Sequence, residues 1–532
     1  MKEHKLFLLI VFISSIFLSD PDVNIGAGLY AEKIPSQFSQ QSIEIKGTVN
    51  DVILKDLNND GIQEILFQQN RDLIIYVLQS STGESLIQNS IYHLPDDVCM
   101  FGIVNKQGLI YVSSKGISSL PIELNISGKK LQPITSTLLF PTSTIFRDEV
   151  FDVPLHKNFI FNLDKDKSMM VIPDTNKFFL VNDTYQAEEI HLPMTSNIYW
   201  NNSSIFEPLI TEASLPYFVF ADLNNDKYND FIVLKQNKIY GYLLNEPDQS
   251  DSRAGKEKQK FKDIGCLLDA SESDSQLIKD INNDSCADVI CANNNDGTIY
   301  IYLNRYSTLR NNGANSIEHF YALSPTLYSN TPTQIIRTNS WIIKNDLIDL
   351  NNDSLNDLVL VQMNKLGIMG GLQAILGQML EWEIAVYLAR PTQNTSTSPY
   401  PKSPDYIRTM KLPFSFSYAG PLLVGKRSEI KIQIPHLWNL EGDFNGDGIK
   451  DLLISGVKDG SLEIYLGDKS QIFSRSLSAS IDLLSVNKKF KLAGKSYISD
   501  INNDGKSDII IPYDQENPDK SISHFYEILL SH

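Results

Sequence analysis

Six short stretches of this sequence repeat one spacing of acidic and amide side chains. Each reads Asp-x-Asn-x-Asp-x-x-x-Asp/Glu, and they cover residues 56–64, 222–230, 280–288, 349–357, 443–451 and 500–508. Side-chain oxygens at positions 1, 3, 5 and 9, with the backbone carbonyl oxygen at position 7, make the all-oxygen ligand set that Ca²⁺ prefers. Carboxylates and amides are poor ligands for softer metals and do not support redox chemistry. The spacing therefore predicts calcium as the cofactor, at about six sites.

The predicted metal ligands follow the same order in every loop, and the residue at position 7 contributes only its carbonyl oxygen. They are Asp56, Asn58, Asp60, Ile62 and Glu64; Asp222, Asn224, Asp226, Tyr228 and Asp230; Asp280, Asn282, Asp284, Cys286 and Asp288; Asp349, Asn351, Asp353, Leu355 and Asp357; Asp443, Asn445, Asp447, Ile449 and Asp451; and Asp500, Asn502, Asp504, Lys506 and Asp508.

The surroundings of these loops exclude the helix-flanked EF-hand. An EF-hand needs a bidentate Glu at position 12 and a helix on each side, whereas position 12 here is always apolar, as at Phe67 or Ile454, within a strand-like run. The alternative to a metal site is an Asx-rich turn, because Asn and Asp favour turns in any case. Six copies with one ligand spacing favour the metal interpretation.

The loops mark a structural repeat. Two intervals between successive loops are near 58 residues, and the long interval from 56 to 222 leaves room for two degenerate units around 98–112 and 162–172. An apolar run, a turn and a second run follow each loop, as in a β-hairpin, and a further strand precedes it. About four strands per unit, repeated in this way, predict an all-β, seven- or eight-bladed β-propeller, eight by repeat count.

The two ends of the chain predict how the ring closes. The last unit is one strand short, and the strand-like segment 42–46 has no unit of its own. We therefore expect the N-terminal strand to complete the last blade, which removes the open sheet edge.

One interval contains an apparent insertion at 365–382. Leu366, Met369, Leu372, Ile375 and Met379 recur at three- and four-residue steps, which predicts one amphipathic helical insertion despite several glycines. The simpler interpretation packs this helix onto the propeller; the alternative has it contact a membrane or a partner.

The N-terminus has the pattern of an export signal. Lys2 and Lys5 precede an apolar run from 6 to 18 that is shorter than the ~20 residues of a membrane-spanning helix. We expect a signal peptide over 1–31 with cleavage after Ala31, a linker over 32–41 and the propeller over 42–532; an uncleaved anchor is the alternative. The predicted localisation is secreted, periplasmic or at the cell surface, with no transmembrane segment in the mature chain.

Charge and cysteine content limit the partners further. The formal net charge is −18 and there are no basic clusters, which argues against nucleic acid as the partner. Four cysteines do not make a disulfide scaffold. One bridge from Cys266 to Cys286 or Cys291 is an option, and buried free thiols are the other.

The loops, their spacing and the following apolar strand resemble the FG-GAP/VCBS repeats of integrin α-subunit propellers and of many secreted bacterial proteins. The resemblance covers most of the mature chain and implies calcium-ligand roles for the six loops given above. The Gly-Ala-Pro that ends the integrin-type repeat is missing after every loop. Integrin-like partner binding is therefore not implied.

Two function classes follow. The eight histidines are isolated and no His-Glu-x-x-His, Gly-x-Ser-x-Gly or phosphate-binding glycine loop is present, which favours a monomeric, non-catalytic adhesion or ligand-binding module for an extracellular protein or glycan. The alternative is a carbohydrate-active enzyme such as a polysaccharide lyase. The enzyme would be favoured by clustering of four basic residues, Arg310, Lys365, Arg390 and Lys426. A lectin would be favoured by an exposed aromatic shelf formed by Trp200, Trp341, Trp382 or Trp438. The simpler expectation for each tryptophan is that it packs in the core.

Overall fold

The structure is a computed structural model. It describes residues 38–79, 85–104, 108–122, 124, 136–141, 153–156, 159–162, 168–173, 177–182, 185–191, 195–200, 209–214, 217–235, 237–245, 260–270, 273–306, 327–365, 379–391, 398–413, 415–419, 429–433, 438–455, 461–469, 472–475, 477–482, 490–492, 496–516 and 522–532.

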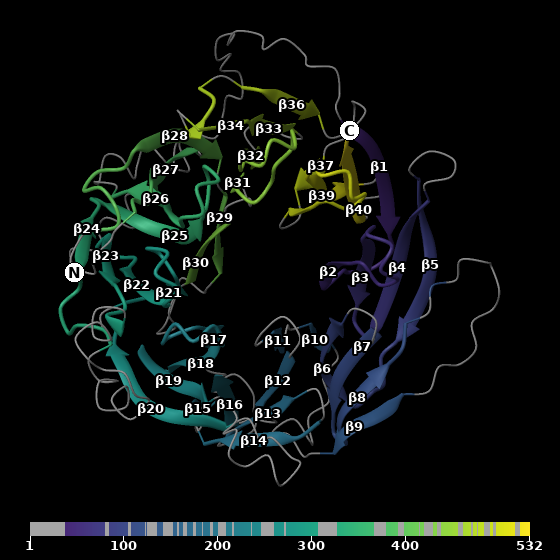
Figure 1. Cartoon of the computed structure of the whole chain (residues 1–532). Coiled ribbons are helices and arrows are strands. Elements are labelled where there is room, and N and C mark those ends of the chain that lie inside the picture. The colour runs from purple at the N-terminus through teal and green to yellow at the C-terminus, as the bar shows by residue number, and fades with distance from the viewer. Residues whose placement is uncertain are drawn as a thin grey trace.

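The strands of the described residues form eight blades arranged in a ring (Figure 1). In a typical blade the chain starts near the centre and steps outward, so that β2 (Asp51–Lys55) is innermost and β5 (Ser85–His93) outermost in the first blade. The eight blades confirm the repeat count made from the sequence. The degenerate units around 98–112 and 162–172 are blades in their own right.

Six blades carry a predicted calcium loop between their first two strands. Their strands are β2 (Asp51–Lys55), β3 (Glu64–Gln69), β4 (Asp72–Gln79) and β5 (Ser85–His93) in blade 1; β17 (Tyr217–Ala221), β18 (Asp230–Lys235), β19 (Lys238–Asn245) and β20 (Lys260–Asp269) in blade 4; β21 (Ser275–Lys279), β22 (Asp288–Asn293), β23 (Thr298–Tyr302) and β24 (Gln334–Arg337) in blade 5; β25 (Ser340–Ile348), β26 (Asp357–Asn364), β27 (Met379–Tyr387) and β28 (Tyr406–Pro413) in blade 6; β31 (Trp438–Asn439), β32 (Leu452–Ser455), β33 (Ser461–Tyr465) and β36 (Ala479–Asp482) in blade 7; and β38 (Tyr497–Ser499), β39 (Asp508–Glu516), β40 (Ile522–Ser531) and β1 (Phe38–Ile45) in blade 8.

The other two blades lack a predicted loop. Blade 2 contains β6 (Val98–Val104), β7 (Gly108–Ser113), β8 (Gly116–Leu120) and β9 (Thr137–Pro141), with β10 (Leu155–His156) parallel to β6. Blade 3 contains β11 (Ile160–Asn162), β12 (Ser168–Pro173), β13 (Phe178–Asn182) and β14 (Ala187–Ile190).

Several short strands lie outside the main strands of the blades. Two-stranded ribbons connect blade 3 to blade 4, β15 (Thr195–Trp200) with β16 (Leu209–Ser214), and blade 6 to blade 7, β29 (Ser415–Ala419) with β30 (Glu429–Gln433). A short hairpin of β34 (Gly467–Asp468) and β35 (Ile472–Phe473) lies within blade 7, and β37 (Phe490–Leu492) pairs with β39.

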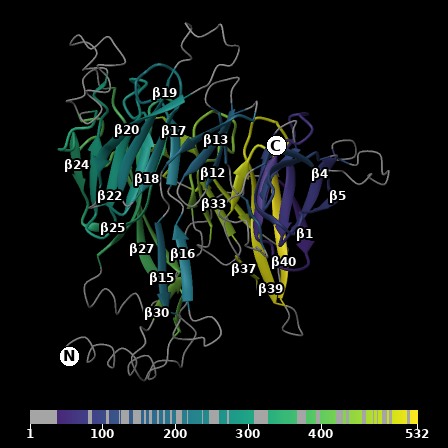
Figure 2. The same cartoon turned by 90° about the horizontal axis from the view of Figure 1, so that it is seen from below.

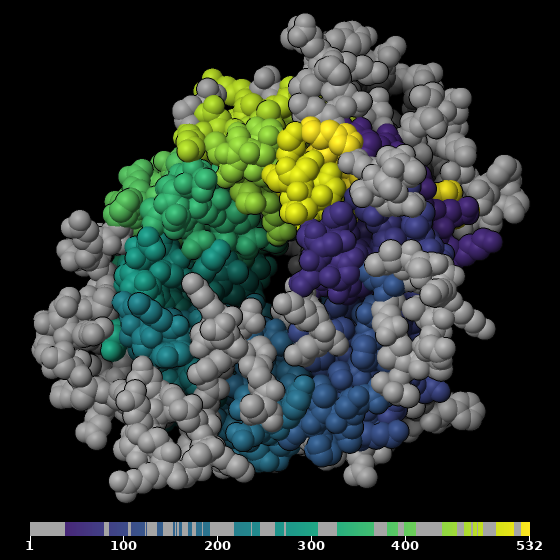
Figure 3. Space-filling view, turned by 45° about the vertical axis from the view of Figure 1, so that its right-hand side comes forward, coloured from purple at the N-terminus to yellow at the C-terminus, as the bar shows by residue number. Residues whose placement is uncertain are grey.

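The N-terminal strand closes the ring, as the sequence predicts. β1 pairs antiparallel with β40 along its whole length, from Phe38 opposite Ser531 to Ile45 opposite His524. Figure 3 shows the seam, where the first strands lie directly against the last ones. The strand begins at Phe38 rather than at Ser42.

The hydrophobic core is divided among the blade junctions. Each apolar cluster of the described residues combines side chains from two adjacent blades, and together the clusters cover all eight junctions. The second strand of a blade faces a neighbour on both sides, which is why segments such as Leu452–Ser455 read as continuous apolar runs. Packing between blades, rather than one central core, therefore holds the ring together.

The predicted helical insertion at 365–382 is wrong over the part that the structure describes. Residues 379–382 belong to strand β27, which pairs with β26 and β28. Leu380, Trp382 and Ile384 are buried while Glu381 between them is exposed, so the period is two rather than three or four. Residues 366–378 lie outside the described part of the chain.

Two further findings concern membranes and thiols. In the described residues, no helix is long and apolar enough to cross a bilayer. The four cysteines are free; Cys99, Cys286 and Cys291 are buried as expected, whereas Cys266 is exposed. The optional bridge from Cys266 is not formed.

Candidate metal centre

The six predicted loops all lie at one end of the ring. Each joins the innermost strand of its blade to the second strand, and because this connection is the same in every blade, the loops share one face. Ser531, next to the C-terminus, donates its N–H to Asp508 of the last loop at 2.7 Å. In Figure 2 the C-terminus therefore marks the loop end, and β15, β16 and β30 extend beyond the opposite end.

The loops share one backbone conformation. Position 4 is Asn in five loops and Gly446 in the other, with φ between 55° and 75°. Position 6 also has positive φ, between 67° and 90°; it is Gly61, Gly448 or Gly505 in three loops, and Lys227, Ser285 or Ser354 in the others. Two residues with left-handed backbone conformation, at positions 4 and 6, turn the chain sharply enough to bring positions 1, 3 and 5 around one centre.

Short hydrogen bonds fix the acidic side chains of each loop. The carboxylate at position 1 accepts the N–H of position 6 at 2.8–3.0 Å in all six loops. The carboxylate at position 5 accepts the N–H of position 7 at 2.8–2.9 Å. These donors are neutral, so they position the carboxylates without cancelling their negative charge.

The carboxylate at position 9 connects the loop to the rest of its blade. One of its oxygens accepts the N–H of position 2 at 2.6–3.0 Å. In five loops the other oxygen accepts an N–H at the end of the third strand, from Leu244, Asn304, Ala389, Gly467 or Ser531, at 2.7–2.9 Å. Position 9 is thus a structural tie as well as a predicted ligand.

Burial raises the pKa of the carboxyl group at position 9, which makes it a weaker acid than usual. Desolvation raises the pKa of Glu64 and of Asp357 to about 7, and that of Asp451 and of Asp508 to about 6, against the lowering effect of their backbone N–H donors. The pKa values of Asp230 and Asp288 are raised well above the usual range for the same reason. A nearby divalent cation would favour the charged form of each.

The donor set fits calcium, although its side chains are turned toward the loop itself. In five loops the amide Nδ2 of Asn at position 3 donates to the carboxylate at position 5, at 2.9–3.3 Å, a direction from which a cation would also approach that carboxylate. Accordingly, within the described residues no three acidic, His or Cys side chains converge as a ready-made metal cluster. Ion binding would require small rotations of these side chains, within a backbone that is already curved around the site.

Comparison with known families agrees with this geometry. Residues 443–511, which span the loops of blades 7 and 8, match the FG-GAP-like repeat family. The chain is an eight-bladed propeller with FG-GAP-like repeats. No curated protein matches its sequence.

Solved structures offer only distant similarity to this FG-GAP propeller. A lectin of Agrocybe aegerita, described as recognising non-reducing terminal N-acetylglucosamine, has 11% identity and a TM-score of 0.32, with 83% of this chain and 80% of that chain covered. The periplasmic gluconolactonase of Pseudomonas aeruginosa has 9% identity and a TM-score of 0.28, with 81% and 95% covered. TM-scores this low carry no argument about function.

Neighbouring loops contact one another, four of the five pairs through a hydrogen bond, which the sequence did not reveal. The residue at position 8 of one loop contacts the backbone near position 1 of the preceding loop. The contacts are Ala287 N–H to Asp222 O at 2.7 Å, Asn356 Nδ2 to Asp280 O at 2.7 Å, Ser507 N–H to Asp443 O at 2.7 Å and Gln63 N–H to Ile501 O at 2.8 Å. Gly448 approaches Asn352 so closely that an added Cβ would lie 3.1 Å from its Nδ2. The six loops therefore form a belt from blade 4 through blade 8 to blade 1.

Buried polar side chains support this belt. Tyr328 donates its hydroxyl to Ala287 O at 2.6 Å, and Tyr400 donates to Asn356 O at 2.7 Å. Asn304 Nδ2 donates to Leu223 O at 3.0 Å. These residues lie far from the motif in sequence, so no pattern within one repeat could identify them. The degenerate loop at 163–167 lies outside the described residues.

The basic residues considered for catalysis are not brought together where the structure describes them. Lys365 Nζ donates to Asp296 O at 3.0 Å, whereas Arg390 pairs with Asp405 at 3.6 Å. Arg310 and Lys426 lie outside the described residues. Among the tryptophans, Trp382 is buried in the junction between blades 6 and 7 and Trp341 is half-buried, while the side chains of the other two are not described.

Proposed function

We propose that this FG-GAP propeller is an exported, calcium-stabilised, non-catalytic module that binds an extracellular protein or glycan. The observation that carries the calcium assignment is the all-oxygen donor set repeated in six loops with one backbone conformation. The N-terminal sequence supports export, and the acidic balance of the chain argues against nucleic acid as the ligand.

Calcium has a structural role in this proposal. Each loop holds three carboxylates within a few residues, and their hydrogen-bond donors are neutral. Repulsion among such charges opposes the closed loop by several kcal/mol, on the order of what Coulomb's law gives at short range, and a bound divalent cation reverses it. Because the loops contact one another, ions in them would stabilise the blade junctions as well as the blades.

Metal analysis of the purified protein tests the calcium assignment. We expect about six Ca²⁺ per chain after removal of free metal, one for each loop motif. Asp447→Asn, which removes one predicted ligand charge, should lower the count by about one ion. Asp263→Asn, an exposed aspartate outside the loops, is the matched control and should leave the count unchanged. A wild-type protein that retains no calcium would contradict the assignment.

Binding and turnover measured on the same ligands test the non-catalytic role. Immobilised glycans and extracellular matrix proteins should retain the protein without being altered. Acidic polysaccharides incubated with the protein should show no ultraviolet absorbance from unsaturated sugar products. Steady formation of such products would instead establish the polysaccharide lyase alternative.

A further inference from the structure

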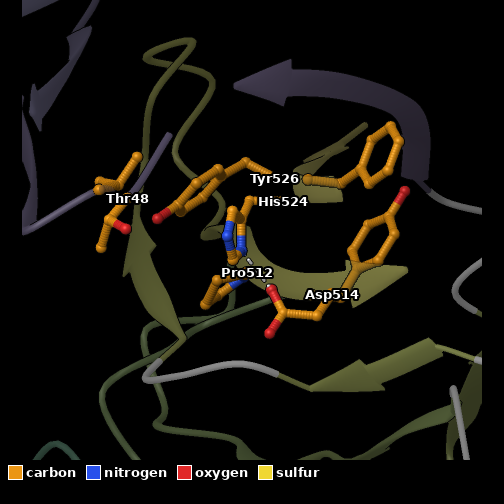
Figure 4. Close-up of a pocket in the computed structure, with 8 residues that line it drawn as sticks. Thr48, Pro512, Asp514, His524 and Tyr526 are labelled. Atoms are coloured by element: carbon orange, nitrogen blue, oxygen red, sulfur yellow. Dashed lines mark hydrogen bonds and ion pairs between the residues drawn. The ribbon is translucent and has the colours of Figure 1, made fainter. Parts of the chain in front are cut away.

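A small cavity lies at the seam where the two ends of the ring meet. It has a volume of about 140 Å³ and is lined mainly by Thr48, Val49, Pro512, Asp514, His524 and Tyr526 (Figure 4). Thr48 and Val49 belong to the segment that leads from the closing strand β1 to β2, whereas the other four residues come from β39 and β40. The cavity therefore depends on both ends of the chain and exists only in the closed ring.

The register of β39 and β40 places four of these side chains on one face. Pro512 lies opposite Tyr526, and Asp514 lies opposite His524. Since alternate residues of a strand share a face, these two cross-strand pairs point to the same side. Tyr513 and Phe525 point to the other side, where their rings stack with centroids 5.2 Å apart. The polar face is thus separate from the aromatic pair that backs it.

The Asp514–His524 pair gives the cavity an oriented imidazole. Nδ1 of His524 lies 2.6 Å from Oδ1 of Asp514, so the imidazole donates to the carboxylate through Nδ1. This bond fixes the ring and leaves Nε2 as the second polar atom of the imidazole. The other oxygen of Asp514 remains as an acceptor.

Two hydroxyl groups complete the polar lining. Tyr526 is buried, and its ring centroid lies 4.6 Å from that of Phe67. Burial, with Asp514 and Asp51 nearby, raises the pKa of the Tyr526 hydroxyl, which therefore remains a donor at neutral pH. No hydrogen bond among the described residues uses this hydroxyl or that of the exposed Thr48.

We propose that this seam cavity binds a single neutral sugar residue of a glycan ligand. The inference rests on the ligand-binding role proposed above and assigns its site. The hydroxyls of Thr48 and Tyr526, the imidazole of His524 and the free oxygen of Asp514 include donors and acceptors around one small space. Sugar hydroxyls both donate and accept, so adjacent hydroxyls of one ring can satisfy all four groups.

Size and charge support a sugar over other ligand classes. One water needs a cavity of roughly 10–15 Å³. A cavity of about 140 Å³ therefore holds several waters or one sugar ring, but not a chain of several sugars. Val49, Pro512 and the ring of Tyr526 offer apolar surface for the C–H face of such a ring. The carboxylate of Asp514 disfavours anions, and Asp51, bonded to His156 at 2.7 Å, adds to the negative field near Tyr526.

Saturation-transfer-difference NMR with methyl glycosides of neutral hexoses and N-acetylhexosamines tests the proposal on the full mature chain. At least one glycoside should give transfer signals with the wild-type protein. Thr48→Val and Tyr526→Phe each remove one hydroxyl with little change of shape, and each should weaken binding by roughly 2- to 10-fold, the usual effect of losing one hydrogen bond. Asp514→Asn should weaken it as well, because it replaces the acceptor oxygen that faces the sugar by an NH2 donor and removes the charge that holds the imidazole.

The pair His524→Ala and His93→Ala provides the matched control. His93 pairs with Asp72 at 2.7 Å in the same way but is exposed on β5, away from the cavity. The His524 variant should lose binding and the His93 variant should retain it. Equal melting temperatures for the two variants would show that the loss is not caused by unfolding.

Three outcomes would overturn the proposal. The first is the absence of a signal from any glycoside. The second is sugar binding that all four variants at Thr48, Tyr526, Asp514 and His524 leave unchanged. The third is preferential binding of a small organic cation, tested as ethylammonium chloride, over every glycoside. Unchanged sugar binding in the variants would place the sugar elsewhere and leave the proposed ligand-binding role intact. Failure of that role would instead appear as retention of no glycan or protein in the binding experiments above.

Discussion

Glu527 is a buried carboxyl group in the middle of β40, next to the closing strand. It is 1% exposed, and its Oε2 has no hydrogen-bond partner among the described residues. Desolvation raises its pKa from 4.5 to about 7. Because the folded-state pKa is higher than the unfolded one, its contribution to stability is complete below pH ~4.5 and is lost as the pH rises through about 7.

Glu527→Gln should therefore stabilise the protein above pH 7. The shift corresponds to at most about 3 kcal/mol, from 1.36 kcal/mol per pKa unit. Chemical denaturation in excess calcium at pH 5 and pH 8 should show a larger gain for the variant at pH 8. Glu44→Gln, an exposed change on the adjacent strand β1, is the control. Equal gains at both pH values would contradict the assignment of a buried, ionising Glu527.

Ser354 occupies position 6 of its loop with a φ of 68°, where three other loops have glycine. Ser354→Gly should raise the free energy of unfolding by about 0.5–1 kcal/mol, because glycine adopts this conformation without strain. Ser403 is exposed and has no positive φ. Ser403→Gly should be neutral or slightly destabilising. Denaturant midpoints measure both changes, and a loss of stability in Ser354→Gly would show that the backbone there is not strained.

At the scale of single residues, the sequence reveals the repeated loop motif but not the contacts between loops. The positions of Asp443, Asn445 and Asp447 follow from one repeated spacing. The bond from Ser507 to Asp443 joins two repeats, so it depends on how neighbouring blades pack. A pattern within a single repeat contains no information about that packing.

The ends of individual strands are predictable from the sequence wherever a loop motif or a turn signal marks them. Blade 2 is recognisable from two apolar runs and a turn, and blade 3 from the remnant of the loop motif at Asn162, Asp164 and Asp166; both occupy the interval expected for one unit. The predicted helix over 365–382 is wrong at its C-terminal end because Met379 and Leu380 also suit a helical spacing. The alternation of Leu380, Glu381, Trp382 and Glu383 is the better signal, since it leads directly into the buried apolar run 384–387 of β27.

The closing strand β1 provides a test at the level of one element. A chain that begins at Phe38 keeps β1, and one that begins at Lys46 lacks it. The shorter chain should melt at least ~10 °C lower or be insoluble, because it exposes the edge of β40 and removes the buried Ile45, whose burial alone contributes about 2 kcal/mol. Equal melting temperatures for the two chains would mean that β1 does not hold the ring closed.

The whole molecule is a ring whose eight apolar junctions are reinforced unevenly. The belt of contacting loops runs from blade 4 through blade 8 to blade 1, and blades 2 and 3 have no predicted metal loop. The ring and its closure could be predicted from repeat spacing and from the missing strand. The cavity at the seam could not, because its residues come from the two ends of the chain and meet only after closure.

The central claim is that calcium in the six loops stabilises this ring. Its most direct test is the melting temperature of the mature protein in excess calcium and in excess chelator. With several kcal/mol expected from each loop, removal of calcium should lower the melting temperature by on the order of 10 °C or more. An unchanged melting temperature would contradict the claim, and the six loops would then be turns that shape the blades without metal.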